Sequence, residues 1–162
     1  MERNPYAPPK AKLTEAEADG SSLAGFPVES KPFTPRQHFV ASFLGAPIAA
    51  AWLAAHNYRA LARPQDARRV VIWGIVVTLV VFGIAVVIPE GFPNAVLPLA
   101  YCVVVLTLAK QRFGDLVDAH GAAGGETASW WRVVGIGLSS LIVVGLILTA
   151  LVFVLVYAGV VE

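Results

Sequence analysis

Long runs without a charged residue dominate the chain. They extend from Gln37 to Tyr58, Val70 to Ile88, Gly91 to Ala109 and Val133 to Val161. A bilayer core about 30 Å thick is crossed by about 20 apolar residues in a helix. The pattern therefore predicts an all-α integral membrane protein, built as a small helical bundle of three clear transmembrane helices and a less regular first segment.

The three clear spans have recognisable limits. The first covers residues 64–88. The second covers 93–110 and continues as a helix beyond the membrane to residue 120. A Gly-rich loop at 121–129 ends that extension, because glycine clusters favour flexible connections. The last span covers 130–160.

The first apolar segment, residues 34–62, contains a proline near its middle. Thr34 and Gln37 have the spacing of a capping box, which predicts that a helix begins beside them. Pro47 removes a backbone donor and disfavours a helical conformation at Ala46. The segment is therefore either a kinked fourth span or a re-entrant pair of half-helices, which is tolerated where the turn is buried against protein.

The basic residues distinguish these two arrangements. If residues 34–62 span, the basic residues before and after them lie on opposite sides of the membrane. If the segment is re-entrant, all twelve Lys and Arg fall on one side, because the turn at 88–94 and the C-terminal end contain none. The positive-inside rule favours the re-entrant arrangement, whereas the long apolar run favours a span. Both alternatives stay open at this point.

Residues 1–33 precede the first helix. They include Pro5, Pro8, Pro9 and Pro27 among scattered charged residues and show no helical apolar repeat. Such a segment buries too little apolar surface to offset the entropy lost on ordering. We expect a disordered, Pro-rich tail.

Composition supports the membrane assignment and excludes several functions. Of 162 residues, 57% are hydrophobic and 14% charged, with a mean hydropathy of +0.68; a soluble domain usually carries about a quarter charged residues. The net charge of +1 gives no basic field for nucleic acid. Cys102, the only cysteine, allows no intrachain disulfide or Cys-based metal site. No catalytic motif is present, and we expect no cofactor, no metal and no nucleic acid.

The spans carry no Asp, Glu, Lys or Arg, which disfavours ion-coupled transport. They do carry small residues four positions apart. Such faces allow helices to approach closely in lipid. The predicted helix-packing pairs are Gly74 with Thr78, Gly135 with Ser139, and Gly145 with Thr149.

Polar and aromatic residues at the ends of the spans could bind a lipid headgroup or a partner. Arginine supplies forked donors to phosphate, and exposed aromatic side chains anchor interfaces. Alternatively, the group from His56 to Arg69 is a positive-inside anchor, and the group from His120 to Arg132 is a connector that ends in an interfacial aromatic belt. The three histidines match no metal-ligand spacing. The candidates are His56, Asn57, Tyr58, Arg59, Arg63, Arg68, Arg69, His120, Trp130, Trp131 and Arg132.

Several phrases together resemble a family of small, uncharacterised bacterial inner-membrane proteins. The resemblance covers most of residues 34–146 and implies a bacterial membrane protein, with no activity or binding residue to carry over. The phrases are Asn4-Pro5-Tyr6-Ala7-Pro8-Pro9-Lys10-Ala11, Phe43-Leu44-Gly45-Ala46-Pro47, His56-Asn57-Tyr58-Arg59-Ala60-Leu61 and Gly124-Gly125 followed by Ser129-Trp130-Trp131-Arg132.

The sequence thus predicts a non-catalytic, multi-pass protein of a bacterial inner membrane, with most basic residues cytoplasmic. It would act through lipid or protein contacts, as an accessory subunit or small membrane factor. Its partners would be the lipid bilayer and another membrane protein or a second copy. The alternatives are an immunity protein against a membrane-targeting toxin, and a membrane enzyme or carrier that acts on an anionic lipid at the cytoplasmic face.

Overall fold

The protein is an all-helical bundle. A computed structural model describes residues 25–89, 91, 93 and 95–157, and within these residues no strand is formed. Among the described residues, four helices are long and apolar enough to cross a membrane, which confirms the predicted class of a small helical membrane bundle. They are α2 (Pro35–Ala60), α3 (Pro64–Val87), α4 (Val96–Ala122) and α5 (Trp130–Tyr157).

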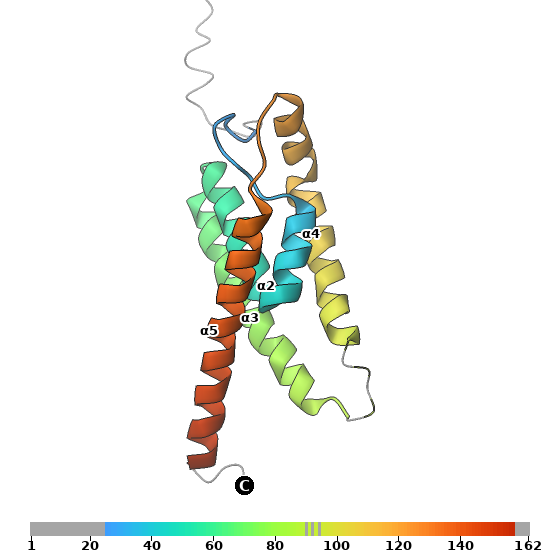
Figure 1. The fold of residues 1–162 in the computed structure, drawn as a ribbon, viewed down its shortest axis with the longest axis vertical. Helices are drawn as coiled ribbons and strands as arrows, with labels where there is room; N and C mark the ends of the chain where they lie inside the picture. The colour runs from blue at the N-terminus through green and yellow to red at the C-terminus, as the bar shows by residue number, and fades with distance from the viewer. Residues whose placement is uncertain (1–24, 90, 92, 94, 158–162) are drawn as a thin grey trace, which may run out of the picture.

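Helix α2 is a hairpin of two arms. Its backbone leaves the helical region at Gly45 and Ala46, where φ is −124° and +62°. The first arm descends into the bundle and the second returns to the level of the start of α3 (Figure 1). Phe33 and Asn57 hydrogen-bond to each other at 2.8 Å, although 24 residues of straight helix would separate them by roughly 36 Å. The first segment therefore folds back on itself with its two ends together. This is the geometry that the re-entrant alternative requires, whereas a kinked span would carry the two ends apart.

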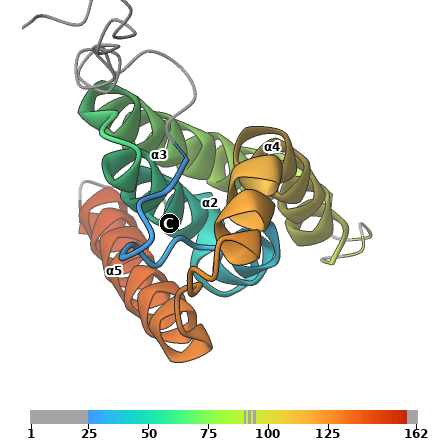
Figure 2. The same cartoon turned by 90° about the horizontal axis from the view of Figure 1, so that it is seen from above.

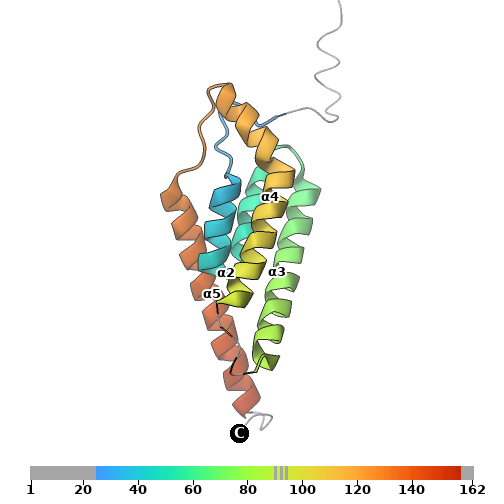
Figure 3. The same cartoon turned by 90° about the vertical axis from the view of Figure 1, so that its right-hand side faces the viewer.

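The other three helices run antiparallel in turn around α2 (Figures 2 and 3). Each of them packs against α2, and none packs extensively against another of the three. In the apolar 18-residue stretch of α2, 61% of the residues are buried, against 17% or less in the corresponding stretches of α3, α4 and α5. Helix α2 therefore supplies the core, and α3, α4 and α5 present most of their apolar surface outward, as helices surrounded by lipid do.

The hairpin is built from small residues. Ala41, Ala49 and Ala55 are fully buried, and Leu53 is the one large aliphatic side chain of α2 that is buried to the same extent. In lipid, burying apolar surface gives no driving force between helices, so association depends on close packing. Small side chains on α2 allow three neighbouring helices to approach one short element.

Helix α3 approaches α2 at the predicted pair Gly74 and Thr78. Both residues are buried. A Cβ at Gly74 would overlap the Cβ of Ala51 on α2. The Thr78 hydroxyl donates to the Gly74 carbonyl at 2.7 Å, which satisfies the hydroxyl within its own helix. This pair therefore lies at the α2–α3 contact.

Helix α5 packs on α2 through a different face from the one that its sequence predicted. Gly137 is buried, and a Cβ there would lie 2.9 Å from the Cβ of Leu44 at the hairpin tip. A Cβ at Gly45 would likewise lie 2.9 Å from the Cβ of Ser140. Small residues occur on more than one face of α5, and their spacing does not reveal which face meets α2. The predicted pairs on α5 are exposed and therefore do not pack against another helix of this chain: Gly135 with Ser139, and Gly145 with Thr149.

The prediction that residues 1–33 form a disordered tail is wrong for residues 25–33. Residues 1–24 lie outside the described residues. From residue 25 onward the chain packs across the open end of the α2 hairpin, where Phe26 and Phe33 are 7% and 2% exposed. These two aromatic side chains bury enough surface to order a segment whose proline and charge content indicated a mobile chain.

Candidate functional site

Two buried amide side chains close the open end of the hairpin. Asn57 accepts from the Phe33 N–H through Oδ1 and donates to the Phe33 carbonyl through Nδ2, both at 2.8 Å. Gln37 accepts from the Thr34 N–H through Oε1 and donates to the Ala128 carbonyl through Nε2 at 2.6 Å. The predicted capping box is present. The segment before α2 and the loop before α5 are thus fixed to the same end.

His120 belongs to this closing structure. Its ring packs edge-on against Phe26, with centroids 6.0 Å apart, and its Nε2 lies 3.2 Å from the Glu126 carbonyl oxygen. The Glu126 carboxylate accepts from Lys31 Nζ at 2.6 Å, and this hydrogen bond lowers the pKa of Glu126. Both side chains of that ion pair are exposed, so it adds little stability. His120 therefore helps to order the loop.

The basic residues of the described chain gather at this closed end. They come from the segment before α2, the ends of its two arms, the first turns of α3, the last turns of α4 and the start of α5. No described residue of 70–109 or 133–157 is charged. The nine described basic residues are Lys31, Arg36, Arg59, Arg63, Arg68, Arg69, Lys110, Arg112 and Arg132.

A groove of about 570 Å³ runs between α3 and α4, with α2 as its floor. It exists because α3 and α4 both pack on α2 but not extensively on each other. The floor is formed by the small side chains of the second arm of α2, and the walls are apolar. Its principal apolar lining is Ala50, Ala51 and Ala54 on α2, Val70 and Val77 on α3, and Val104 on α4.

The mouth of the groove is basic. Arg63 and Arg69 of the α3 side and Arg112 of α4 line it, together with one carboxylate, Asp66. The Asp66 carboxylate lies 3.8 Å from the Arg69 guanidinium, in an exposed i,i+3 pair. Three guanidinium groups against one carboxylate leave the mouth positively charged. The ring of Tyr58 also lines it, held edge-on by Phe113 at 5.0 Å.

His38 lines the same groove and has an unsatisfied nitrogen. The side chain is 1% exposed and stacks on Phe113 with centroids 5.7 Å apart. Its Nδ1 lies 2.8 Å from the Thr34 carbonyl oxygen, which can only accept, so Nδ1 carries a hydrogen. In the neutral ring Nε2 is then an acceptor, and it is buried without a hydrogen-bond partner. Such groups are rare and point to a function or a ligand.

The structure separates the residues that the sequence grouped together. Tyr58, Arg63 and Arg69 lie on the groove. Arg59 instead places its guanidinium 5.8 Å from the Trp52 ring, away from it. The remaining predicted residues do not line the groove. These are His56, whose ring packs on Phe33, the buried Asn57, the exposed Arg68, His120, the exposed Trp130 and Trp131, and Arg132.

Sequence reasoning missed Arg112, Asp66 and His38 as members of one site. Arg112 stands on an extension of α4 far along the chain, and only the packing of that helix on α2 brings it opposite α3. For His38, its position four residues after the cap residue Thr34, in an apolar segment, was the one available signal that the ring is buried.

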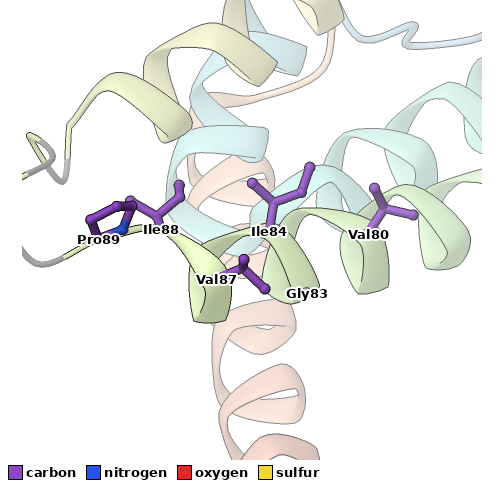
Figure 4. A pocket seen from close by; sticks show the side chains of 6 residues that line it. All are labelled: Val80, Gly83, Ile84, Val87, Ile88 and Pro89. Carbon is purple, nitrogen blue, oxygen red and sulfur yellow. The ribbon is translucent and has the colours of Figure 1, made fainter.

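A second, shallower pocket lies near the far end of α3. Figure 4 shows that all of its lining side chains come from this helix and the residues after it. The lining consists of apolar residues only, Val80, Gly83, Ile84, Val87, Ile88 and Pro89. It offers no group that could orient a polar ligand.

An apolar groove with three arginines at its mouth has the groups needed to hold an elongated apolar molecule with an acidic end. Among the described residues, no group of three His, Cys, Asp or Glu side chains is placed to hold a metal ion. No family model matches the chain, and the comparisons with curated proteins and with solved structures found no match.

Proposed function

We propose that the protein is a non-catalytic, multi-pass membrane protein that acts through contacts with anionic membrane lipid. Its basic end would lie on the cytoplasmic side of a bacterial inner membrane. In this view the protein is a small membrane factor whose partner is the lipid leaflet itself. The observation that carries the proposal is the excess of basic residues at the closed end of the bundle, where all nine described basic residues gather with five acidic ones.

The charge distribution supports this orientation. Cytoplasmic loops of membrane proteins carry an excess of Lys and Arg. Anionic lipids of that leaflet attract basic residues near the surface, by about 1 kcal/mol for each. Because the two ends of the α2 hairpin lie together, the residues before it and after it contribute to one basic surface instead of two smaller ones.

The tryptophans beside this surface fit the same arrangement. Trp130 and Trp131 stand at the start of α5 and are 51% and 83% exposed. Tryptophan is enriched at the level of lipid headgroups. They would fix the depth of the basic end at the interface, with the uncharged parts of α3, α4 and α5 in the hydrocarbon core.

The test extracts the full chain from bacterial membranes in polymer-bounded discs that retain the surrounding lipid. We expect anionic lipids to be enriched in the discs over the bulk membrane, and the enrichment to fall with salt, which screens exposed charges. Replacing Arg59 and Arg132 together by Gln should lower this enrichment. A lipid composition equal to that of the bulk membrane, or a stoichiometric protein partner without lipid enrichment, would contradict the proposal.

A further inference from the structure

The groove between α3 and α4 has the dimensions of a lipid site within one leaflet. From Arg112 at its mouth to Tyr101 at its deep end, α4 advances roughly 16 Å at 1.5 Å per residue. Half of a hydrocarbon core about 30 Å thick is similar in depth. The groove therefore extends from the basic surface to about the middle of the bilayer, beside the second arm of the hairpin.

The volume of the groove is that of a small-molecule site. At about 570 Å³ it lies in the usual range of about 300–1,000 Å³. An acyl chain, which is much narrower than a helix about 10 Å across, fits between α3 and α4.

The two ends of the groove call for different chemistry. The deep part is lined by apolar side chains, whereas Arg63, Arg69 and Arg112 line the mouth. Guanidinium groups recognise phosphate through forked hydrogen bonds. An acyl chain gains little by leaving bulk lipid for an apolar groove, since the two environments are alike. Affinity must therefore come mainly from the charged mouth.

We propose that this groove binds one anionic glycerophospholipid, with its phosphate against the three arginines and one acyl chain over the alanine floor of α2. This rests on the proposed function and deepens it, because it replaces a general attraction to the leaflet by one bound molecule. His38 gives further support: the residue lines the groove, and its Nε2 is buried without a hydrogen-bond partner.

The experiment measures phosphatidylglycerol binding to the purified full chain by native mass spectrometry. We expect one tightly bound molecule, and phosphatidylcholine, which has no net charge, should bind at least tenfold more weakly. Arg69→Gln should weaken binding about tenfold, the loss expected for one charge-assisted hydrogen bond. Arg68→Gln is the matched control, because Arg68 is the neighbouring arginine on α3 but does not line the groove.

A second pair of variants tests the acyl-chain part of the site. Val104 and Val103 are adjacent on α4 and about equally exposed, at 57% and 55%, but only Val104 lines the groove. Val104→Trp should fill the groove and reduce binding at least tenfold, while Val103→Trp should leave it within twofold. Glycerol 3-phosphate at the concentration of the lipid should not displace it, because the soluble compound lacks the chain.

The outcomes separate this proposal from the broader one. If Arg68→Gln weakens binding as much as Arg69→Gln, or the two Trp variants behave alike, the groove is not the site, although the basic end still contacts anionic lipid. If free glycerol 3-phosphate displaces the lipid, the site recognises phosphate alone and the lipid proposal is overturned. If headgroup charge has no effect in any variant, both proposals fail.

Discussion

Asn57 holds Phe33 by both of its amide atoms, in a pair of 2.8 Å hydrogen bonds that connects two positions 24 residues apart. Both side chains are buried, at 0% and 2% exposure. The pair closes the hairpin at the surface, while its tip at Gly45 and Ala46 turns inside the bundle. The two arms of α2 are thus fixed at both ends.

Removing this closure should destabilise the fold. Asn57→Ala leaves the buried N–H and carbonyl of Phe33 without partners, and each unsatisfied group costs about 1–3 kcal/mol. We expect a loss of about 2–4 kcal/mol in the free energy of unfolding, measured by denaturant titration in mild detergent. Gln65→Ala, which removes an exposed amide at the start of α3, is the control and should change stability by less than about 0.5 kcal/mol. Equal effects of the two substitutions would contradict the closure.

The contact between the hairpin tip and α5 predicts a difference between two glycines on one helix. A Cβ at Gly137 would lie 2.9 Å from the Cβ of Leu44, whereas a Cβ at Gly135 would meet nothing within 4 Å. Gly137→Ala should therefore destabilise the protein by about 1–3 kcal/mol through overpacking. Gly135→Ala should be neutral or slightly stabilising, because alanine favours helix over glycine. Thermal unfolding in detergent distinguishes the two, and the reverse order would mean that α5 packs through its other face.

Ala46 adopts a conformation that favours glycine. Its φ of +62° and ψ of 176° lie in a region populated almost only by glycine. Ala46→Gly should relieve this strain and raise the free energy of unfolding by about 1 kcal/mol, after the entropic cost of glycine. Ala46→Val, with a branched Cβ, should lower it. A stabilising valine would show that the turn is not formed in this way.

His38 predicts selectivity for a hydroxyl in the bound headgroup. Its Nε2 can accept from the glycerol of phosphatidylglycerol but not from phosphatidylethanol, which has the same charge and no headgroup hydroxyl. We expect about fivefold tighter binding of phosphatidylglycerol, as one hydrogen bond of about 1 kcal/mol provides. His38→Asn keeps a donor near the Thr34 carbonyl, removes Nε2 and should abolish the preference. If the variant still prefers phosphatidylglycerol, a group other than His38 must recognise the headgroup hydroxyl.

The sequence predicted where the helices lie along the chain, but not in every case which face of a helix packs against its neighbour. Runs without charges identified α3, α4 and α5 because the bilayer demands length and apolarity, which are local properties. Gly74 and Thr78 lie at the α2–α3 contact, whereas the small residues chosen on α5 face outward, because spacing alone does not show which face meets a neighbour. The packing of Phe26 was missed, since its partners on α4 are distant in sequence.

The groove was predictable only in part for the same reason. Tyr58, Arg63 and Arg69 are close in sequence, and their arginine and tyrosine content indicated a headgroup site. Arg112 joins them through the packing of α4. Asn57, grouped with them by proximity in sequence, turns inward because its helical position faces the core.

The re-entrant course of α2 underlies both the one-sided basic surface and the groove, and side-specific labelling tests it most directly. In a Cys102→Ser background, single cysteines at Glu29, Gln65 and Thr127 should all react with a membrane-impermeant maleimide from the same side. A cysteine at Gly91, beyond the far end of α3, should react from the opposite side. Labelling of Glu29→Cys and Gln65→Cys from opposite sides would mean that α2 crosses the membrane and would contradict the account.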